Sequence, residues 1–343
     1  MKICIIGAGA IGGFIGTRLA AAGRADVSAM ARGATLGALQ QHGWRLRAAD
    51  GASMLTAPVA SASDRAEALG PQDLVVIAVK GPALAAVARG MAPLLGPHTL
   101  VLPAMNGVPW WFCQGQAGFD GTTPLASVDP DGAIGRALPM AHVVGCVVHA
   151  STSSPEPGVV QHRAGQGLIV GEPGGGHSVR VQALTELLTH AGFETTQSTD
   201  VRHDIWYKLW GNMTMNPVSA LTGATIDRVL ADPLVLAFCS AAMLEAAAIG
   251  ARIGCPVVQS PQDRHAITAK LGAFTPSMLQ DVRAGREIEL DSVVAAVREI
   301  GQRLGLATPN IDALFGLARL FGRVHGLYPA AAAAATPPAA APG

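Results

Sequence analysis

The segment that most constrains the fold lies within the first twelve residues. A β-rich run over residues 2–6 leads into a GxGxxG pattern that opens a helical stretch over residues 11–22. The pattern consists of Gly7, Ala8, Gly9, Ala10, Ile11 and Gly12. Between a strand and a helix, its glycines permit a tight turn, backbone approach to a pyrophosphate, and close helix–strand packing. The pattern therefore predicts a dinucleotide-binding turn, with a purely structural glycine turn as the alternative.

Strand-like and helical segments alternate after this turn. Residues 27–31, 74–79 and 100–103 are apolar runs, and residues 83–95 are helical in character. A continuous apolar run such as residues 74–79 is typical of a strand that is buried on both faces of a parallel sheet. The alternation predicts βαβ units and an α/β fold with an N-terminal Rossmann-like dinucleotide-binding domain.

The sequence pattern changes near Asp200. Strand-like and helical segments alternate before it, and helical periodicity dominates after it. The expected helices cover residues 205–216, 233–253, 261–271, 293–304 and 312–320. We therefore expect three parts: a Rossmann-like domain over residues 1–199 with an excursion at about 108–142, an all-helical C-terminal domain over 200–327, and a tail over 328–343. The tail is rich in alanine and proline, cannot bury a core, and is expected to be disordered.

Composition excludes several functional classes. The chain has 24 Lys and Arg and 24 Asp and Glu, so its formal net charge is +0, which argues against a nucleic-acid partner. The apolar run 234–253 carries Glu245 and is predicted to be a buried helix, so no membrane association is expected. The five cysteines form no CxxC pair, which fits the reducing cytoplasm. The ten histidines show no metal-ligand spacing, so no metal is predicted.

The end of the second expected strand bears on which dinucleotide binds. NAD sites usually place an acidic residue there to bond the ribose 2′-hydroxyl. Here Arg32 follows the strand, and Asp26 stands at its opposite end. Because an arginine can pair with a 2′-phosphate through a charged fork, the sequence favours NADP(H). A solvated arginine is the alternative.

A second group of polar residues lies in an unusually apolar helical segment. Lys208, Asn212 and Asn216 are spaced four residues apart, so they share one helix face among Trp, Leu and Met neighbours. Polar groups in such surroundings need partners, which either the protein or a ligand supplies. A lysine there can act as an acid, its pKa tuned by burial. The alternative is a surface lysine beside helix-capping asparagines.

Five segments taken in order resemble the ketopantoate reductase (2-dehydropantoate 2-reductase) family. They are GAGAIG, LVVIAVK ending at Lys80, the turn Met105-Asn106-Gly107, KLWGNMTMNPVSALTG, and SMLQDVRAGREIELD. The match extends from residue 1 to about 325. The lysine–asparagine helix and the SMLQD segment are specific to that family rather than to Rossmann proteins at large.

The resemblance implies an active site between the two domains and assigns residues to it. Lys208 takes the position of the general acid and Glu289 that of a glutamate near the reacting groups. Cofactor contacts are implied for the glycine turn, Arg32, Lys80 and Asn106, and substrate contacts for Asn106, Asn212, Asn216 and Ser277. The implied reaction is NADPH-dependent reduction of a 2-oxo acid to a 2-hydroxy acid, with ketopantoate to pantoate, in pantothenate and coenzyme A biosynthesis, as the first candidate.

Two departures from the family's sequence pattern leave the identity of the substrate undecided. The excursion after Asn106 is longer than the family pattern and holds Trp110, Trp111 and Phe112, and Ile226 stands where another substrate-side asparagine often lies. The alternatives are a related reductase acting on another 2-oxo acid or hydroxy compound, and a non-catalytic NADP-sensing module. The expected partner is a small molecule, and a homodimer through the helical domain is compatible with the sequence.

Overall fold

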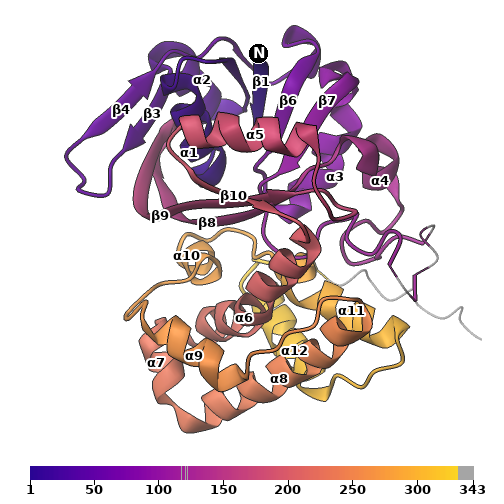
Figure 1. Ribbon diagram of the computed structural model, residues 1–343. Helices are drawn as coiled ribbons and strands as arrows, with labels where there is room; N and C mark the ends of the chain where they lie inside the picture. Colours follow the sequence, from indigo (N-terminus) through magenta and orange to yellow (C-terminus); the bar gives the residue numbers. More distant parts are fainter. Residues whose placement is uncertain (117, 120, 122, 331–343) are drawn as a thin grey trace, which may run out of the picture.

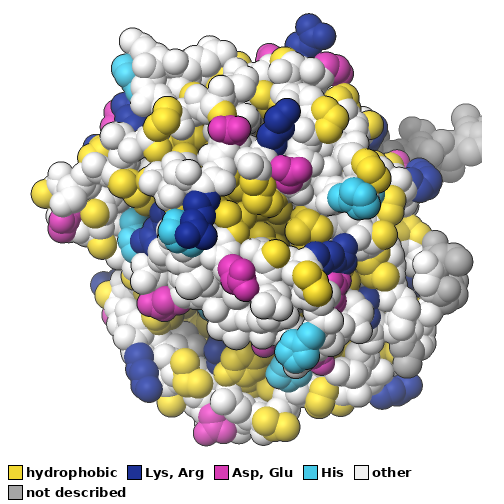
Figure 2. All heavy atoms as spheres, turned by 45° about the horizontal axis from the view of Figure 1, so that its top comes forward, with side chains coloured by type: hydrophobic (Ala, Val, Ile, Leu, Met, Phe, Trp, Pro, Cys, Tyr) yellow, Lys and Arg dark blue, Asp and Glu magenta, His cyan; other side chains and the backbone are white. Residues whose placement is uncertain are grey.

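The computed structural model describes residues 1–330 except 117, 120 and 122. An α/β part carrying both β-sheets lies against a group of helices, α6 to α12 (Figure 1). The predicted fold class, a Rossmann-like N-terminal domain followed by a helical C-terminal domain, is confirmed. On the face drawn in Figure 2, positive and negative side chains are interspersed.

The first sheet is parallel and has the strand order β5-β2-β1-β6-β7. Its strands are β1 (Lys2–Ile6), β2 (Asp26–Met30), β5 (Ala62–Ser63), β6 (Gln72–Ile77) and β7 (Leu95–Pro103). Alternate residues of β1 face opposite sides of the sheet. Ile3 and Ile5 belong to the core around α1 (Ala10–Ala21), whereas Cys4 and Ile6 belong to the core around α3 (Gly81–Gly90). Both faces of this sheet are therefore covered.

A second, mixed sheet lies on the α1 side of the first. Its strand order is β10-β9-β3-β4, and β8 pairs with β9. The strands are β3 (Trp44–Arg47), β4 (Met54–Ala57), β8 (Gly145–Glu156), β9 (Val159–Gly171) and β10 (Glu194–Ser198), and α5 (Val179–His190) connects the last two. Helix α1 contacts this sheet closely, because a Cβ atom on Gly13 would lie 2.5 Å from Val160 and one on Gly16 would lie 2.6 Å from Trp44.

The excursion after β7 is largely packed against the rest of the protein. It contains α4 (Ala133–Ala137) and a 3-10 turn, η3 (Met140–His142). Trp110, Trp111 and Phe112 are each at most 3% exposed, and the ring of Phe112 stacks on that of Trp206 with centroids 5.9 Å apart. The excursion thus joins the cores of the two domains. The remaining short elements of the α/β part are α2 (Gly33–His42), η1 (Ala66–Ala68) and η2 (Ala92–Leu94).

The helical part is organised around α6 (Val201–Thr222), which packs against α8, α10 and α12. The other helices are α7 (Ile226–Ala231), α8 (Pro233–Arg252), α9 (Pro261–Ala269), α10 (Ser277–Arg283), the π-helical turn η4 (Asp291–Ala295), α11 (Ala296–Arg303) and α12 (Pro309–Val324). Tyr328 donates a hydrogen bond to Asp291, so it belongs to the folded chain rather than to the predicted tail. Residues 331–343 of that tail lie outside the described residues.

Helix α8 is the one helix of the described chain that is long and apolar enough to cross a bilayer. Of its apolar stretch 33% is buried. The expectation of a buried helix is wrong for its outer face, where Leu234 is 81% and Leu244 is 59% exposed. The carboxylate of Glu245 accepts hydrogen bonds from the backbone N–H groups of Asn310 and Ile311. Helix α8 thus caps the start of α12.

Candidate active site

The glycine turn has the geometry that a dinucleotide requires. Gly7 has a φ of 85°, and its N–H donates to the carbonyl of Met30 at 3.0 Å. Helix α1 begins at Ala10, after Gly9, and no side chain caps its first N–H groups. A Cβ atom on Gly9 would meet nothing within 4 Å, whereas one on Gly12 would lie 2.0 Å from the carbonyl oxygen of Gly7. Gly12 is therefore required by packing, and the space over Gly9 is open for a pyrophosphate.

Arg32 follows β2, the neighbour of β1 in the sheet, and is the N-cap residue of α2. Its side chain is exposed and forms no ion pair with any residue that the structure describes. A guanidinium in this position is available to an external anion beside the glycine turn. The residues that the sequence assigns to the cofactor's phosphates thus lie at adjacent strand ends.

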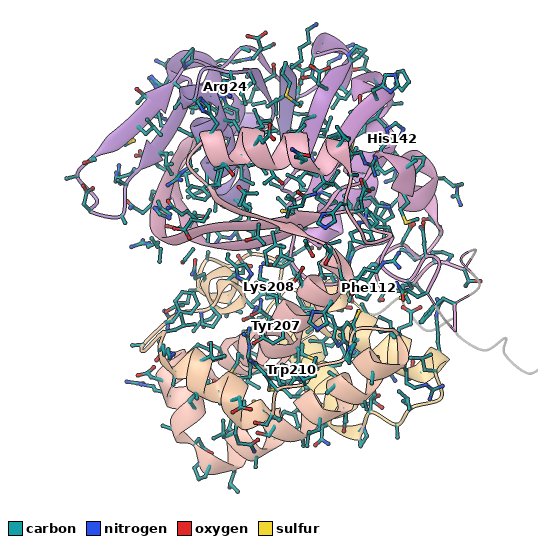
Figure 3. All side chains as sticks on the ribbon, viewed as in Figure 1. Arg24, Phe112, His142, Tyr207, Lys208 and Trp210 are labelled. Carbon is teal, nitrogen blue, oxygen red and sulfur yellow. The ribbon has the colours of Figure 1, made fainter. Side chains whose placement is uncertain are left out.

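Lys208 is the central polar group between the two domains (Figure 3). Its Nζ donates to Oδ1 of Asn106 at 2.9 Å and to the carbonyl of Val148 on β8 at 2.7 Å. Burial lowers the pKa of Lys208 from 10.5 to about 8, and the nearby Cys146 and Glu289 partly oppose this shift. The alternative of a surface lysine is excluded by this geometry. The ammonium instead lies at the carboxyl end of β7, where Asn106 follows the strand.

Glu289 and Lys80 connect the domains at the start of α3. An oxygen of the Glu289 carboxylate accepts from the backbone N–H of Gly81 at 3.1 Å, and burial raises the pKa of Glu289. The Nζ of Lys80 donates to the carbonyl of Glu287 at 3.3 Å and pairs with the buried carboxylate of Asp281. Lys80 is thus bound to the helical domain, although 38% of its side chain is exposed.

Asp281 is a site residue that the sequence reasoning missed. Its carboxylate, 8% exposed, also pairs with Arg286 at 3.1 Å, so it holds two cations at the domain boundary. The available signal is the SMLQD segment, in which Asp281 is an acidic residue next to family-specific positions. The sequence could not identify Val148 either, because Val148 contacts Lys208 through its backbone carbonyl, a group that every residue has.

The residues assigned to the substrate lie at different depths. Asn212 lines a small cavity of about 20 Å³ together with Lys208, Asn106 and Cys146. Asn216 is 8% exposed one turn further along α6. Ser277 is exposed at the first residue of α10, which packs against α6. The structure therefore brings Lys208, Asn106 and Asn212 together, whereas Asn216 and Ser277 do not line this cavity.

The described residues hold no group of three or more His, Cys, Asp or Glu side chains suited to a metal ion. All five cysteines are buried free thiols. The charged groups named above can bind anions and transfer protons.

Comparison with known proteins identifies the family. Residues 3–175 match the family model described as ketopantoate reductase PanE/ApbA, and residues 200–321 match the corresponding C-terminal model. A 2-dehydropantoate 2-reductase from Mesorhizobium japonicum is 43% identical over 328 residues, which cover 96% of this chain and 100% of the relative.

Two crystal structures extend this likeness to the fold. A Ralstonia solanacearum protein assigned as a ketopantoate reductase is 54% identical, with a TM-score of 0.89 and coverage of 95% of this chain and 99% of that one. A PanE/ApbA family ketopantoate reductase from Ralstonia eutropha is 27% identical, with a TM-score of 0.80 and coverage of 95% and 100%. The family models together match most of the sequence; the first match lies within the α/β part and the second within the helical part. This chain belongs to the ketopantoate reductase family.

Proposed function

We propose that this chain reduces ketopantoate to pantoate in the cytoplasm, with NADPH as the hydride donor. One observation carries the proposal: an ammonium group from the helical domain, that of Lys208, is held by Asn106 at the end of a strand of the dinucleotide-binding sheet. The family of the chain and its 43% identical relative, a 2-dehydropantoate 2-reductase, support the same reaction.

The residues of the glycine turn fit the cofactor. The open space over Gly9 and the uncapped start of α1 suit a pyrophosphate, and Arg32, which has no ion-pair partner among the described residues, suits a 2′-phosphate. When bound, the cofactor supplies the hydride that reduces the ketone. Lys80 and Asn106, at the ends of β6 and β7, are the proposed contacts on the nicotinamide side.

Lys208 provides the proton. As the ketone carbon is reduced, negative charge develops on its oxygen, and a cationic ammonium beside that oxygen stabilises the charge and then protonates it. A pKa of about 8 leaves Lys208 mostly protonated at neutral pH while making its proton easier to release than that of a free lysine. Asn106 and the carbonyl of Val148 fix the direction of the ammonium.

Neutral donors position the substrate. Asn212, beside Lys208, is placed to bond the substrate without adding charge, and we assign Asn216 and Ser277 to the same role on α6 and α10. Glu289 lies at the boundary of the two domains, where burial raises the pKa of its carboxyl group and the charge of Lys208 partly opposes this shift. We propose that it orients Lys208 or accepts a substrate hydroxyl.

The test is NADPH oxidation, followed at 340 nm, with ketopantoate and a panel of other 2-oxo acids. Turnover of ketopantoate supports the proposal. Reduction of other acids in preference to ketopantoate would favour a related reductase. NADPH binding without turnover of any acid would favour an NADP-sensing module.

We also propose that the chain pairs with a second copy through its helical domain. Exposed apolar residues gather on α8 and α12, where Leu234 is 81% exposed and Leu317 and Leu320 are each 60% exposed. Apolar patches of this kind are characteristic of interaction surfaces. Sedimentation analysis should show a dimer that Leu317→Glu converts to a monomer. A wild-type monomer at all accessible concentrations would refute the pairing.

A further inference from the structure

Arg264, in α9, is a cation beside α6 that has no polar partner within the protein. Its guanidinium forms neither a hydrogen bond nor an ion pair with any residue that the structure describes. The Nε atom is buried, and Cζ lies 4.8 Å from the centre of the Tyr207 ring. Contact with an aromatic ring stabilises a cation but satisfies none of its N–H donors. The guanidinium therefore has donors available to a ligand.

Gly211 of α6 makes room for this guanidinium. A Cβ atom on Gly211 would lie 2.7 Å from Nε of Arg264 and 3.0 Å from its Nη2. Glycine is unfavourable inside a helix, so a glycine in the middle of α6 needs a structural reason, and the close approach of Arg264 supplies it. The contact also places Arg264 near Lys208, because residues three positions apart are neighbours on a helix surface.

His149 lies within electrostatic reach of both Arg264 and Lys208. It follows Val148 on β8, the residue whose carbonyl accepts a hydrogen bond from Lys208. Burial lowers the pKa of His149, and the positive charges of Lys208 and Arg264 lower it further, against the opposing charge of Asp204. The imidazole is therefore mostly uncharged at neutral pH, and the positive charge around it comes from Lys208 and Arg264.

The other cations named at the domain boundary are already engaged. Lys80 and Arg286 both pair with the carboxylate of Asp281. Lys208 is held by two neutral oxygens and is assigned to the ketone. Of these four cations, Arg264 alone has neither a polar partner among the described residues nor a role in the site.

The order of polar groups around α6 matches the order of groups in the proposed substrate. At 3.6 residues per turn, Asn212 lies about 40° from Lys208 on one side, and Gly211 lies about 60° from it on the other. Lys208 thus stands between Asn212 and the guanidinium over Gly211. In ketopantoate the ketone stands between a carboxylate and a carbon chain that ends in a hydroxyl group. A ketone at Lys208 can therefore direct these two ends to opposite sides.

We propose that Arg264 binds the carboxylate of the 2-oxo acid and so makes the site specific for acids. This inference rests on the proposed function. A guanidinium offers two parallel N–H donors that match the two oxygens of a carboxylate. Asn212 and Asn216 are then left for the carbon chain and its hydroxyl group. The hydride and proton transfers are unchanged, so Arg264 contributes to substrate binding and not to the chemical step.

The test measures the KM values for ketopantoate and for NADPH in wild type, Arg264→Gln and Arg264→Lys. Arg264→Gln removes the charge but keeps a polar side chain over Tyr207. It should raise the KM for ketopantoate about 10- to 100-fold, the scale of a charge-assisted hydrogen bond, and leave the KM for NADPH unchanged. Arg264→Lys keeps the charge but loses the paired donors, so its KM for ketopantoate should lie between those of wild type and Arg264→Gln.

Lys270→Ala is the matched control, because it removes a positive charge from the end of the same helix, and both KM values should stay unchanged. A wild-type KM for ketopantoate in Arg264→Gln would overturn the inference. Equal rises in the two KM values would do the same, since a purely structural role of Arg264 would cause them. Equal KM values for ketopantoate in the Gln and Lys variants, both above wild type, would show that the charge is irrelevant and would also overturn it.

Wild-type turnover separates this inference from the proposed function. If wild type reduces ketopantoate while any of these contrary results is found, the proposed function stands and only the role of Arg264 is refuted. If wild type fails to reduce ketopantoate, the proposed function is refuted, and the inference with it.

Discussion

The Nζ atom of Lys208 lies 2.9 Å from Oδ1 of Asn106, although the two residues are 102 positions apart and come from different domains. Asn106 follows the last strand of the dinucleotide-binding sheet, and Lys208 lies in the second turn of α6. The contact therefore fixes a proton-donating group against the domain that binds the hydride donor. It depends on both domains, so neither half of the chain would form it alone.

Arg32→Ala should weaken NADPH binding selectively. The exposed guanidinium has no ion pair within the described chain, so its removal costs the protein no internal contact. Loss of a charge-assisted hydrogen bond predicts an increase of about 10-fold or more in the KM for NADPH and little change for NADH. Arg24→Ala, at the other end of β2, is the control. If the KM values for NADPH and NADH rose equally, Arg32 would not be the residue that contacts the 2′-phosphate.

Substitutions at two glycines of the turn should affect different properties: Gly9→Ala the affinity for NADPH, and Gly12→Ala the stability of the fold. Gly9→Ala adds a methyl group in open space, so the melting temperature should stay near that of wild type while NADPH affinity falls. Gly12→Ala forces a Cβ atom to within 2.0 Å of the Gly7 carbonyl and should lower the melting temperature markedly. Thermal unfolding and cofactor titration measure both effects. Unchanged NADPH affinity in Gly9→Ala would refute the proposed pyrophosphate site.

Asn212→Ala should raise the KM for the 2-oxo acid about 10-fold, the scale of one hydrogen bond to a charged group, while the KM for NADPH stays unchanged. Asn212→Asp should raise it further, because a carboxylate beside the anionic substrate repels it. Steady-state kinetics with each substrate varied in turn test this. If the two variants had the same KM as wild type, Asn212 would not contact the substrate.

The sequence predicted those features that depend on local pattern. The glycine turn follows from spacing and from the flanking strand and helix, and the shared face of Lys208 and Asn212 follows from the helical period. Both are properties of one segment and its neighbours. The parallel sheet was likewise recognisable from the buried run of β6, which is apolar because both of its faces are covered.

Features that depend on distant contacts could not be predicted in this way. Strands β3 and β4 have four residues each and β4 is mostly exposed, so they carry no apolar run. The contact of Glu289 with Gly81 joins residues 208 positions apart, and the cavity of about 290 Å³ beside α3 arises only where the excursion meets α3 and the helical domain. The outer face of α8 was misjudged because apolar composition does not distinguish a buried surface from an exposed one.

The most direct test of the account is the pH dependence of kcat for ketopantoate reduction in wild type and in Lys208→Ala. Since the ammonium is the acid and burial lowers the pKa of Lys208 to about 8, wild-type kcat should fall tenfold per pH unit above that value. Lys208→Ala should be slower by about 10²- to 10⁴-fold and lack this limb, with NADPH binding intact. Lys270→Ala, which removes an exposed lysine, should behave as wild type. A Lys208→Ala variant that kept wild-type turnover, or kept the same alkaline limb, would contradict the account.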